Sequence, residues 1–228
     1  HYFHQAVIFP KIKQLIDLKN IKSVFDLGCG QGVWERQLNI HTEYVGLDMA
    51  ESLIREARSR SLSPKHKFIT ADVSKSLPIK ENYYDLGVII LALQNIKNVT
   101  GVVKNAKKHL KMGGQFLIVL NHPMFRIPRQ SSWGMDENSK TQYRRIDGYM
   151  TEKEIPITTH PGKMNSQKTW SFHYPLSKYS HDLAKNGFVI ELIDEWTSDK
   201  KSTGSKAKME DRARREIPMF MAILAKKI

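Results

Sequence analysis

Strand-length apolar segments alternate with helix-length amphipathic segments through the first 120 residues, and this alternation is the feature that most constrains the fold. Repeated strand–helix–strand units put parallel strands in one sheet with helices on both faces, because their crossovers are right-handed. The pattern therefore predicts an α/β fold with a doubly wound sheet. The expected strands are Ser23–Leu27, Glu43–Asp48, Lys67–Thr70, Tyr84–Leu91 and Gln115–Leu120, and the expected helices are 31–38, 50–60 and 99–111, the last closed by Gly113-Gly114.

The alternation lapses between residues 121 and 168, which are rich in proline and polar side chains, and then returns. A helix opening at Pro175 precedes a sixth strand, Phe188–Ile193, and Ile217–Ala225 reads as a seventh. A long connection inside a compact domain typically forms a lid or a binding loop. We therefore expect one domain over residues 1–228, with 122–173 as an insertion after the fifth strand that forms the acceptor site and its lid.

The chain carries 36 Lys+Arg against 23 Asp+Glu, a formal net charge of +13. Such a charge favours an anionic partner if it gathers on one face. Here it is spread along the sequence, with local excesses in 197–216 and in the lysine-bearing helix 99–111, so both solvated surfaces and nucleic-acid contact stay open. No apolar run approaches the ~20 residues that span a bilayer. One cysteine and the absence of a signal segment predict a cytoplasmic protein whose first residues have been removed.

The most informative segment runs from Val24 to Gly32 and reads Val-Phe-Asp-Leu-Gly-Cys-Gly-Gln-Gly. A strand that enters closely spaced glycines lets the backbone approach a ligand where a Cβ would clash. Dinucleotide-binding turns have a third glycine at the position that Val33 occupies here. Asp26 would also oppose a pyrophosphate. The segment therefore favours a ligand with a positively charged end.

Two more acids follow the next two strands. Asp48 comes twenty residues after Gly28, where a carboxylate can accept both ribose hydroxyls of an adenosine. Asp72 can accept a hydrogen bond from the adenine amine while Val73 packs against the ring. Adenosine with a cationic amino-acid tail describes S-adenosylmethionine. Asp48 could instead cap the helix that follows it, and Asp72 could be an ordinary loop acid.

These segments together resemble the class I S-adenosylmethionine-dependent methyltransferases, of the methyltransferase-11 type. The resemblance covers about residues 20–121, and its segments are Val24–Gly32, Gly46–Met49, Ala71–Val73, Tyr84–Leu86 and Leu110–Gly114. It implies a mostly parallel seven-stranded sheet in the order 3-2-1-4-5-7-6 with the seventh strand antiparallel. It also implies S-adenosyl-L-methionine as cofactor and S-adenosyl-L-homocysteine as product.

The resemblance assigns cofactor-binding roles residue by residue. Gly28 and Gly30 line the methionine part, Leu91 lies beside the sulfonium, and a helix 6–18 covers the cofactor so that Tyr2 contacts it. Cys29 is expected to be a small buried neighbour of the cofactor and not a nucleophile. The full predicted cofactor set is Tyr2, Asp26, Gly28, Cys29, Gly30, Asp48, Met49, Asp72, Val73 and Leu91.

Two acceptor classes are disfavoured by residue type. Methylation of cytosine C5 uses a cysteine nucleophile, and Cys29 is the only cysteine. Methylation of the adenine amino group usually follows an Asn/Asp-Pro-Pro-aromatic turn after the fourth strand, where this chain reads Leu-Ala-Leu-Gln-Asn at 91–95. A small-molecule acceptor remains, and an RNA methyltransferase or a non-catalytic S-adenosylmethionine-binding protein are the alternatives.

The insertion supplies the candidate acceptor residues. Its first residues gather histidine, arginine and aromatic side chains, which suggests an anionic or phenolic ligand. His122 and His173 are candidate bases, and Arg126, Arg129 and Tyr149 are candidate acceptor-binding residues. Each histidine could equally be structural, and the arginines could bind only solvent or a carboxylate. No metal is expected, because the histidines at 122, 160, 173 and 181 lack ligand spacing.

Overall fold

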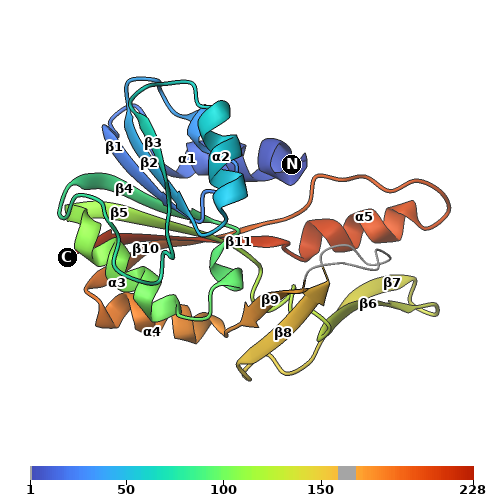
Figure 1. The fold of residues 1–228 in the computed structure, drawn as a ribbon. Coiled ribbons are helices and arrows are strands. Elements are labelled where there is room, and N and C mark those ends of the chain that lie inside the picture. Colours follow the sequence, from blue (N-terminus) through green and yellow to red (C-terminus); the bar gives the residue numbers. More distant parts are fainter. Residues whose placement is uncertain (1, 159–167) are drawn as a thin grey trace.

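The computed structural model describes residues 2–158 and 168–228 (Figure 1). Its centre is a seven-stranded sheet in the order β3-β2-β1-β4-β5-β11-β10, in which β11 runs antiparallel to both neighbours. Because β10 and β11 are the sixth and seventh strands of this sheet, the predicted order and direction are confirmed. The strands are β1 (Ser23–Leu27), β2 (Glu43–Asp48), β3 (His66–Thr70), β4 (Tyr84–Ile90), β5 (Leu110–Asn121), β10 (Phe188–Trp196) and β11 (Phe220–Lys227).

Helices cover both faces of the sheet. Figure 1 shows α1 and α2 on one face and α3 and α4 on the other. Alternate residues of β1 serve the two layers: Val24 packs with α1 and α2, whereas Phe25 packs with α3. The helices are α1 (Phe9–Leu15), α2 (Glu51–Ser59), α3 (Val99–His109), α4 (Leu176–Lys185) and α5 (Ala207–Glu216), with short helical turns η1 (His4–Ile8), η2 (Glu35–Gln37) and η3 (Leu93–Asn95).

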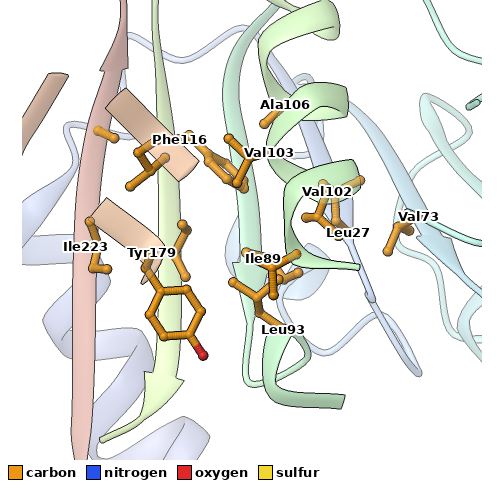
Figure 2. Packing of buried hydrophobic residues seen from close by; sticks show 14 of the residues in the cluster. Leu27, Val73, Ile89, Leu93, Val102, Val103, Ala106, Phe116, Tyr179 and Ile223 are labelled. Carbon is orange, nitrogen blue, oxygen red and sulfur yellow. The ribbon is translucent and has the colours of Figure 1, made fainter. Parts of the chain in front are cut away.

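Helix α3 illustrates how the sequence sets a local element. The side chain of Asn98 accepts a hydrogen bond from the backbone N–H of Gly101 at 2.9 Å, which caps the first turn. Val102, Val103 and Ala106 then fall on one face and pack on the sheet (Figure 2). The helix ends at His109, and β5 begins at Leu110, so Gly113-Gly114 lies within the strand and not at the predicted helix end.

The helix predicted over 31–38 is wrong. Residues 31–34 form turns, and only η2 is helical. Gly30 and Gly32 hold left-handed φ angles of 53° and 66°, which a right-handed helix does not accept. Glu35 is turned inward, where its carboxylate contacts the ring of His66 and accepts the backbone N–H of Leu62 at 3.0 Å. Because the polar pair of Glu35 and His66 is buried, this segment does not have the buried apolar face of a regular amphipathic helix.

The insertion contains two antiparallel hairpins that the sequence pattern did not indicate. They are β6 (Ser131–Asp136) with β7 (Thr141–Ile146), and β8 (Lys153–Thr158) with β9 (Lys168–His173). Helix α5 is a further unpredicted element in the basic stretch after β10. Figure 1 shows both hairpins and α5 gathered at one end of the molecule. The insertion leaves β5 at its carboxyl end, so these elements lie where parallel strands of such sheets present ligands.

Helices able to span a membrane were sought in residues 2–158 and 168–228, and none there combines the required length with the required apolar character.

Candidate functional site

A pocket of about 300 Å³ lies at the carboxyl ends of β1 and β4, and we call it the cofactor pocket. The glycine turn after β1 forms one wall, and the residues after β4 form another. The N-terminal segment that contains η1 and α1 closes it from a third side. Lining residues include His4, Asp26, Gly28, Gly30, Trp34 and Leu91.

The glycine turn needs its glycines for two different reasons. Gly28 has a φ of 74°, and a Cβ built there would lie 2.4 Å from the Cβ of Ala92, so no other residue fits. Gly30 has a φ of 53°, and a Cβ added there would meet no atom of the described residues within 4 Å. The turn is fixed by the N–H groups of Gly28 and Cys29, which both donate to the carbonyl of Leu47. The first glycine allows packing, and the second leaves room for a ligand.

Asp26 places a buried carboxyl group in the wall of the cofactor pocket. The side chain is 2% exposed and accepts a hydrogen bond from the hydroxyl of Tyr44 at 2.8 Å. Burial raises the pKa of Asp26 to about 7, opposed by the Tyr44 hydrogen bond and assisted by the charge of Asp48. A cationic ligand would favour the ionised form, so the group suits a ligand with a positive end.

Asp48 lies at the end of β2, beside the glycine turn. One carboxylate oxygen accepts the N–H of Gly30 at 2.9 Å, and the other accepts the N–H of Ala50 at 2.8 Å. Asp48 is not the helix cap, because the N-cap of α2 is Ala50 and no side chain among the described residues caps that helix. A carboxylate offers about four acceptor positions, so two remain for ribose hydroxyls.

The adenine-side residues lie beyond β2 and β3. Asp72 accepts the N–H and the hydroxyl of Ser74 with one oxygen, which lowers its pKa and keeps it ionised. Met49 is 75% exposed next to Asp48, as a side chain that covers a flat ring would be. Val73 is 5% exposed and belongs to the same core cluster as Leu27 (Figure 2), so its contact with adenine stays a prediction.

The remaining cofactor candidates differ in their placement. Leu91 lines the cofactor pocket with a left-handed φ of 54°, unusual for a bulky residue and typical of functional turns. Cys29 also lines it, and burial next to Asp26 raises the pKa of its thiol, which opposes nucleophilic reactivity. Tyr2 is exposed and donates to Asp199 at 2.8 Å, and His4 takes the expected place in the pocket wall.

The polar groups of the pocket fit the chemistry of S-adenosylmethionine. The indole N–H of Trp34 is buried in its wall and has no hydrogen-bond partner within the described residues. A buried donor without a partner is costly, and a ligand oxygen such as a carboxylate would satisfy it. Asp26 is complementary to the cationic part of the cofactor, and Asp48 is complementary to its ribose hydroxyls.

The two candidate bases lie in a smaller pocket of about 30 Å³, which we call the histidine pocket; its walls include Gln94, His122, Arg126 and His173. The amide of Gln94 donates to the carbonyl of Leu91 at 2.9 Å, which joins this pocket to the cofactor pocket. The Oε1 atom of Gln94 is buried without a hydrogen-bond partner in the described part of the chain. A proton-bearing acceptor group could donate to it.

The two histidines are held differently. In His122, Nδ1 accepts the N–H groups of Met124 and Phe125, and Nε2 lies 2.6 Å from a carboxylate oxygen of Glu195. Both ring nitrogens are therefore engaged, and the geometry gives no support to a role as base. His173 donates from Nε2 to the carbonyl of Tyr149 at 2.7 Å, which leaves Nδ1 to accept a proton. Burial lowers the pKa of His173.

The other predicted acceptor residues do not gather at one place. Arg126 lines the histidine pocket and makes no side-chain hydrogen bond or ion pair with the residues described. Arg129 is exposed and donates to the carbonyl of Pro156 at 2.8 Å, away from both pockets. The hydroxyl of Tyr149 accepts the N–H of Leu176, so this residue supports His173 and the start of α4. His160, weighed as a possible metal ligand, lies outside the described residues.

Sequence reasoning missed several wall residues, among them His4, Phe9, Trp34 and Leu53. The expected N-terminal helix was the one signal that could have found the first two. Trp34 could not be placed because the helix predicted around it does not exist. No pattern in the sequence relates Leu53, on α2, to the turn after β1.

The affinity for S-adenosylmethionine is expected to rise from about pH 6 to about pH 7.5. The raised pKa of Asp26, about 7, means that the free protein holds a proton there which a cationic ligand expels. Calorimetry at about pH 6 in two buffers of different ionisation enthalpy should detect that proton. Asp26→Asn should abolish its release, and an unchanged release in this variant would assign the proton to another group.

Comparison with known proteins agrees with this geometry. A family model described as a methyltransferase domain matches residues 25–118. A crystal structure from Listeria monocytogenes, described as an S-adenosylmethionine-dependent methyltransferase, superposes with a TM-score of 0.76. The two chains are 25% identical, and the match covers 96% of this chain and 97% of that one.

Two curated relatives are named for their acceptors. The demethylmenaquinone methyltransferase of Lactococcus lactis is 27% identical over 128 residues, which cover 53% of this chain and 50% of that protein. The 18S rRNA (guanine(1575)-N(7))-methyltransferase of Saccharomyces cerevisiae is 25% identical over 126 residues, 50% of this chain and 45% of that protein. This chain thus matches half or less of each relative, and the two names give acceptors of different chemical classes.

Proposed function

Because the chain belongs to the class I S-adenosylmethionine-dependent methyltransferases, we propose that it methylates a small-molecule acceptor held by the insertion after β5. When bound, the cofactor supplies a methyl group on a positively charged sulfur, which needs no further activation. The protein's part is to hold two reactants in line and to exclude water. Asp48 would hold the ribose, and Asp26 would face the cationic end. The glycines Gly28 and Gly30 would leave space for the methionine part beside the backbone.

The placement of the lysine-rich helix α3 is the observation that favours a small acceptor over RNA. Lys108 pairs with Glu81 at 2.8 Å, and Lys111, just after the helix, pairs with Asp85 at 2.7 Å. Lys107 donates to the carbonyl of Ile228 at 2.6 Å. Asp85 lies at the amino end of β4, whereas the cofactor pocket lies at its carboxyl end. These cations are therefore partnered and face away from the site of methyl transfer.

A labelling experiment tests this proposal. The protein is incubated with S-adenosylmethionine that carries an isotopic methyl label, together with either a low-molecular-mass metabolite extract or bulk tRNA and rRNA. The label is expected in small molecules and not in RNA. Label that enters only the RNA fraction would favour the second function, and label that enters neither would contradict a catalytic role toward either acceptor class.

A further inference from the structure

A third pocket, of about 260 Å³, lies between the insertion, α5 and the segment after β10. We call it the cationic pocket, and its walls include Phe3, Phe125, Arg126, Trp133, Arg144 and Lys200. Phe3 lines this pocket and the next residue, His4, lines the cofactor pocket, so one short segment separates the two. Arg126 lines both this pocket and the histidine pocket. The cationic pocket therefore adjoins both parts of the proposed site.

Aromatic rings form the apolar part of its wall. Phe3 comes from the N-terminal segment, Phe125 from the residues after β5, and Trp133 from β6. The guanidinium of Arg144 lies 5.2 Å from the centre of the Trp133 ring, across the β6–β7 ladder. Rings and a stacked guanidinium make flat surfaces, which suit a planar or otherwise apolar ligand body.

Three cations reach this pocket without an acid to neutralise them among the described residues. Within the described residues Arg144 donates only to neutral oxygens, the carbonyl of Phe125 at 2.8 Å and the hydroxyl of Ser131 at 2.7 Å. The side chain of Arg126 makes no hydrogen bond and no ion pair with any described residue. Lys200 lies about 5 Å from the ring of Phe3. A fourth lining cation, Arg214, differs because it pairs with Glu210 at 3.6 Å and Asp211 at 3.7 Å.

The positive charge of Arg126 disfavours the charged form of Arg144. Partial desolvation lowers the pKa of Arg126, which keeps an exposed surface, and partial burial together with the charge of Arg126 lowers the pKa of Arg144. Like charges held close without an acid cost free energy, and an anionic group between them would offset that cost. Arginine is also the side chain best suited to bind a carboxylate or phosphate through paired N–H groups.

We propose that the cationic pocket binds the methyl acceptor, and that this acceptor joins an anionic group, a carboxylate or a phosphate, to an aromatic body. The anionic group binds Arg126 and Arg144, and the body lies against Phe125 and Trp133. This assignment rests on the proposed function, since it names the substrate class of the same site. Arg126 was expected to bind the acceptor from the sequence, whereas Arg144, Lys200 and the aromatic wall come from the structure.

Binding of three matched probes tests the assignment, using the full chain saturated with S-adenosylhomocysteine. The probes are 2-naphthoate, 2-naphthyl phosphate and the neutral 2-naphthamide, and calorimetry gives each affinity. At least one of the two anions should bind at least tenfold more tightly than the amide. The anion that binds more tightly shows whether the pocket prefers a carboxylate or a phosphate. Arg126→Gln and Arg144→Gln should each weaken the preferred anion about tenfold or more, the factor expected for a charge-assisted hydrogen bond.

Arg145→Gln is the matched control. Arg145 follows Arg144 on β7, so its side chain lies on the opposite face of the hairpin, and it lines a different depression. This variant removes the same charge and should leave all probe affinities unchanged. Arg126→Gln is expected to fold normally, because the Arg126 side chain makes no hydrogen bond or ion pair with the described residues that the substitution would remove.

Four outcomes would overturn the assignment while S-adenosylhomocysteine binds normally. The first two are equal affinity for the amide and the anions, and no binding of any probe. The third is a loss of anion affinity in Arg145→Gln as large as that in Arg126→Gln and Arg144→Gln. The fourth is binding of bulk tRNA that depends on Arg126 and displaces 2-naphthoate. Failure of the proposed function is detected separately, by the labelling experiment, because the isotopic methyl label would then enter only RNA or neither fraction, whatever the probe affinities are.

Discussion

Asp48→Ala is expected to lower the affinity for S-adenosylmethionine at least tenfold. The carboxylate lies beside the glycine turn and keeps acceptor positions for two ribose hydroxyls while it holds the N–H groups of Gly30 and Ala50. Charge-assisted hydrogen bonds contribute ~1.5–3 kcal/mol each, so two of them correspond to a loss of more than tenfold. Isothermal titration calorimetry of the purified variant measures the loss directly.

The same substitution also removes two bonds to backbone N–H groups, so stability must be separated from binding. Asp85→Ala is the matched control, because Asp85 accepts the N–H groups of Lys22 and Ser23 at the opposite end of the sheet. Both variants should melt at a lower temperature than the unaltered protein, and only Asp48→Ala should lose cofactor affinity. Equal affinity in the two variants would remove Asp48 from the site.

The fold of the cofactor half could be predicted well because its strands and turns are marked by local sequence patterns. Each of Asp26, Gly28 and Asp48 lies at the end of a strand whose apolar run is plain, and the carboxyl ends of parallel strands meet at one edge. The sheet order followed from the resemblance and is confirmed. The failed helix over 31–38 shows the limit of periodicity, since Glu35 has the spacing of a surface residue and yet is buried against His66.

The acceptor half could not be predicted because its residues come from separate elements. Arg144 and Trp133 meet only through the register of the β6–β7 hairpin, and their strands lack the alternation of buried and exposed residues that marks a strand on a core. Lys200 and Phe3 approach each other across almost the whole chain. Such contacts depend on tertiary packing, and a single sequence carries no signal for them.

His173→Ala is expected to lower the turnover about a hundredfold or more at saturating S-adenosylmethionine, provided that the accepting atom must lose a proton. Positioned general bases contribute 10²–10⁴-fold as an order of magnitude. The Nε2–H of His173 is fixed on the carbonyl of Tyr149, so Nδ1 is the basic nitrogen. His173 lines the histidine pocket together with Gln94, whose Oε1 has no hydrogen-bond partner among the described residues. Cofactor affinity should not change, because the cofactor pocket does not include this residue.

The pH profile distinguishes a base from a structural histidine. Burial holds the pKa of His173 below its ordinary value of about 6.5, so the neutral form, which can accept a proton, already predominates at neutral pH. The rate should therefore rise with pH in the mildly acidic range and level off before pH 7, and this limb should vanish in the alanine variant. Saturating cofactor keeps the titration of Asp26 from contributing to it.

His181→Ala serves as the control for His173→Ala, because His181 is an exposed histidine on α4, outside the pockets described. Turnover, pH profile and melting temperature should all match those of the unaltered protein. A His173→Ala variant that melts earlier and yet keeps its turnover and its acidic limb would show that the Tyr149 hydrogen bond is structural. The acceptor would then react without a base from this residue, and alignment of the two reactants would account for the catalysis.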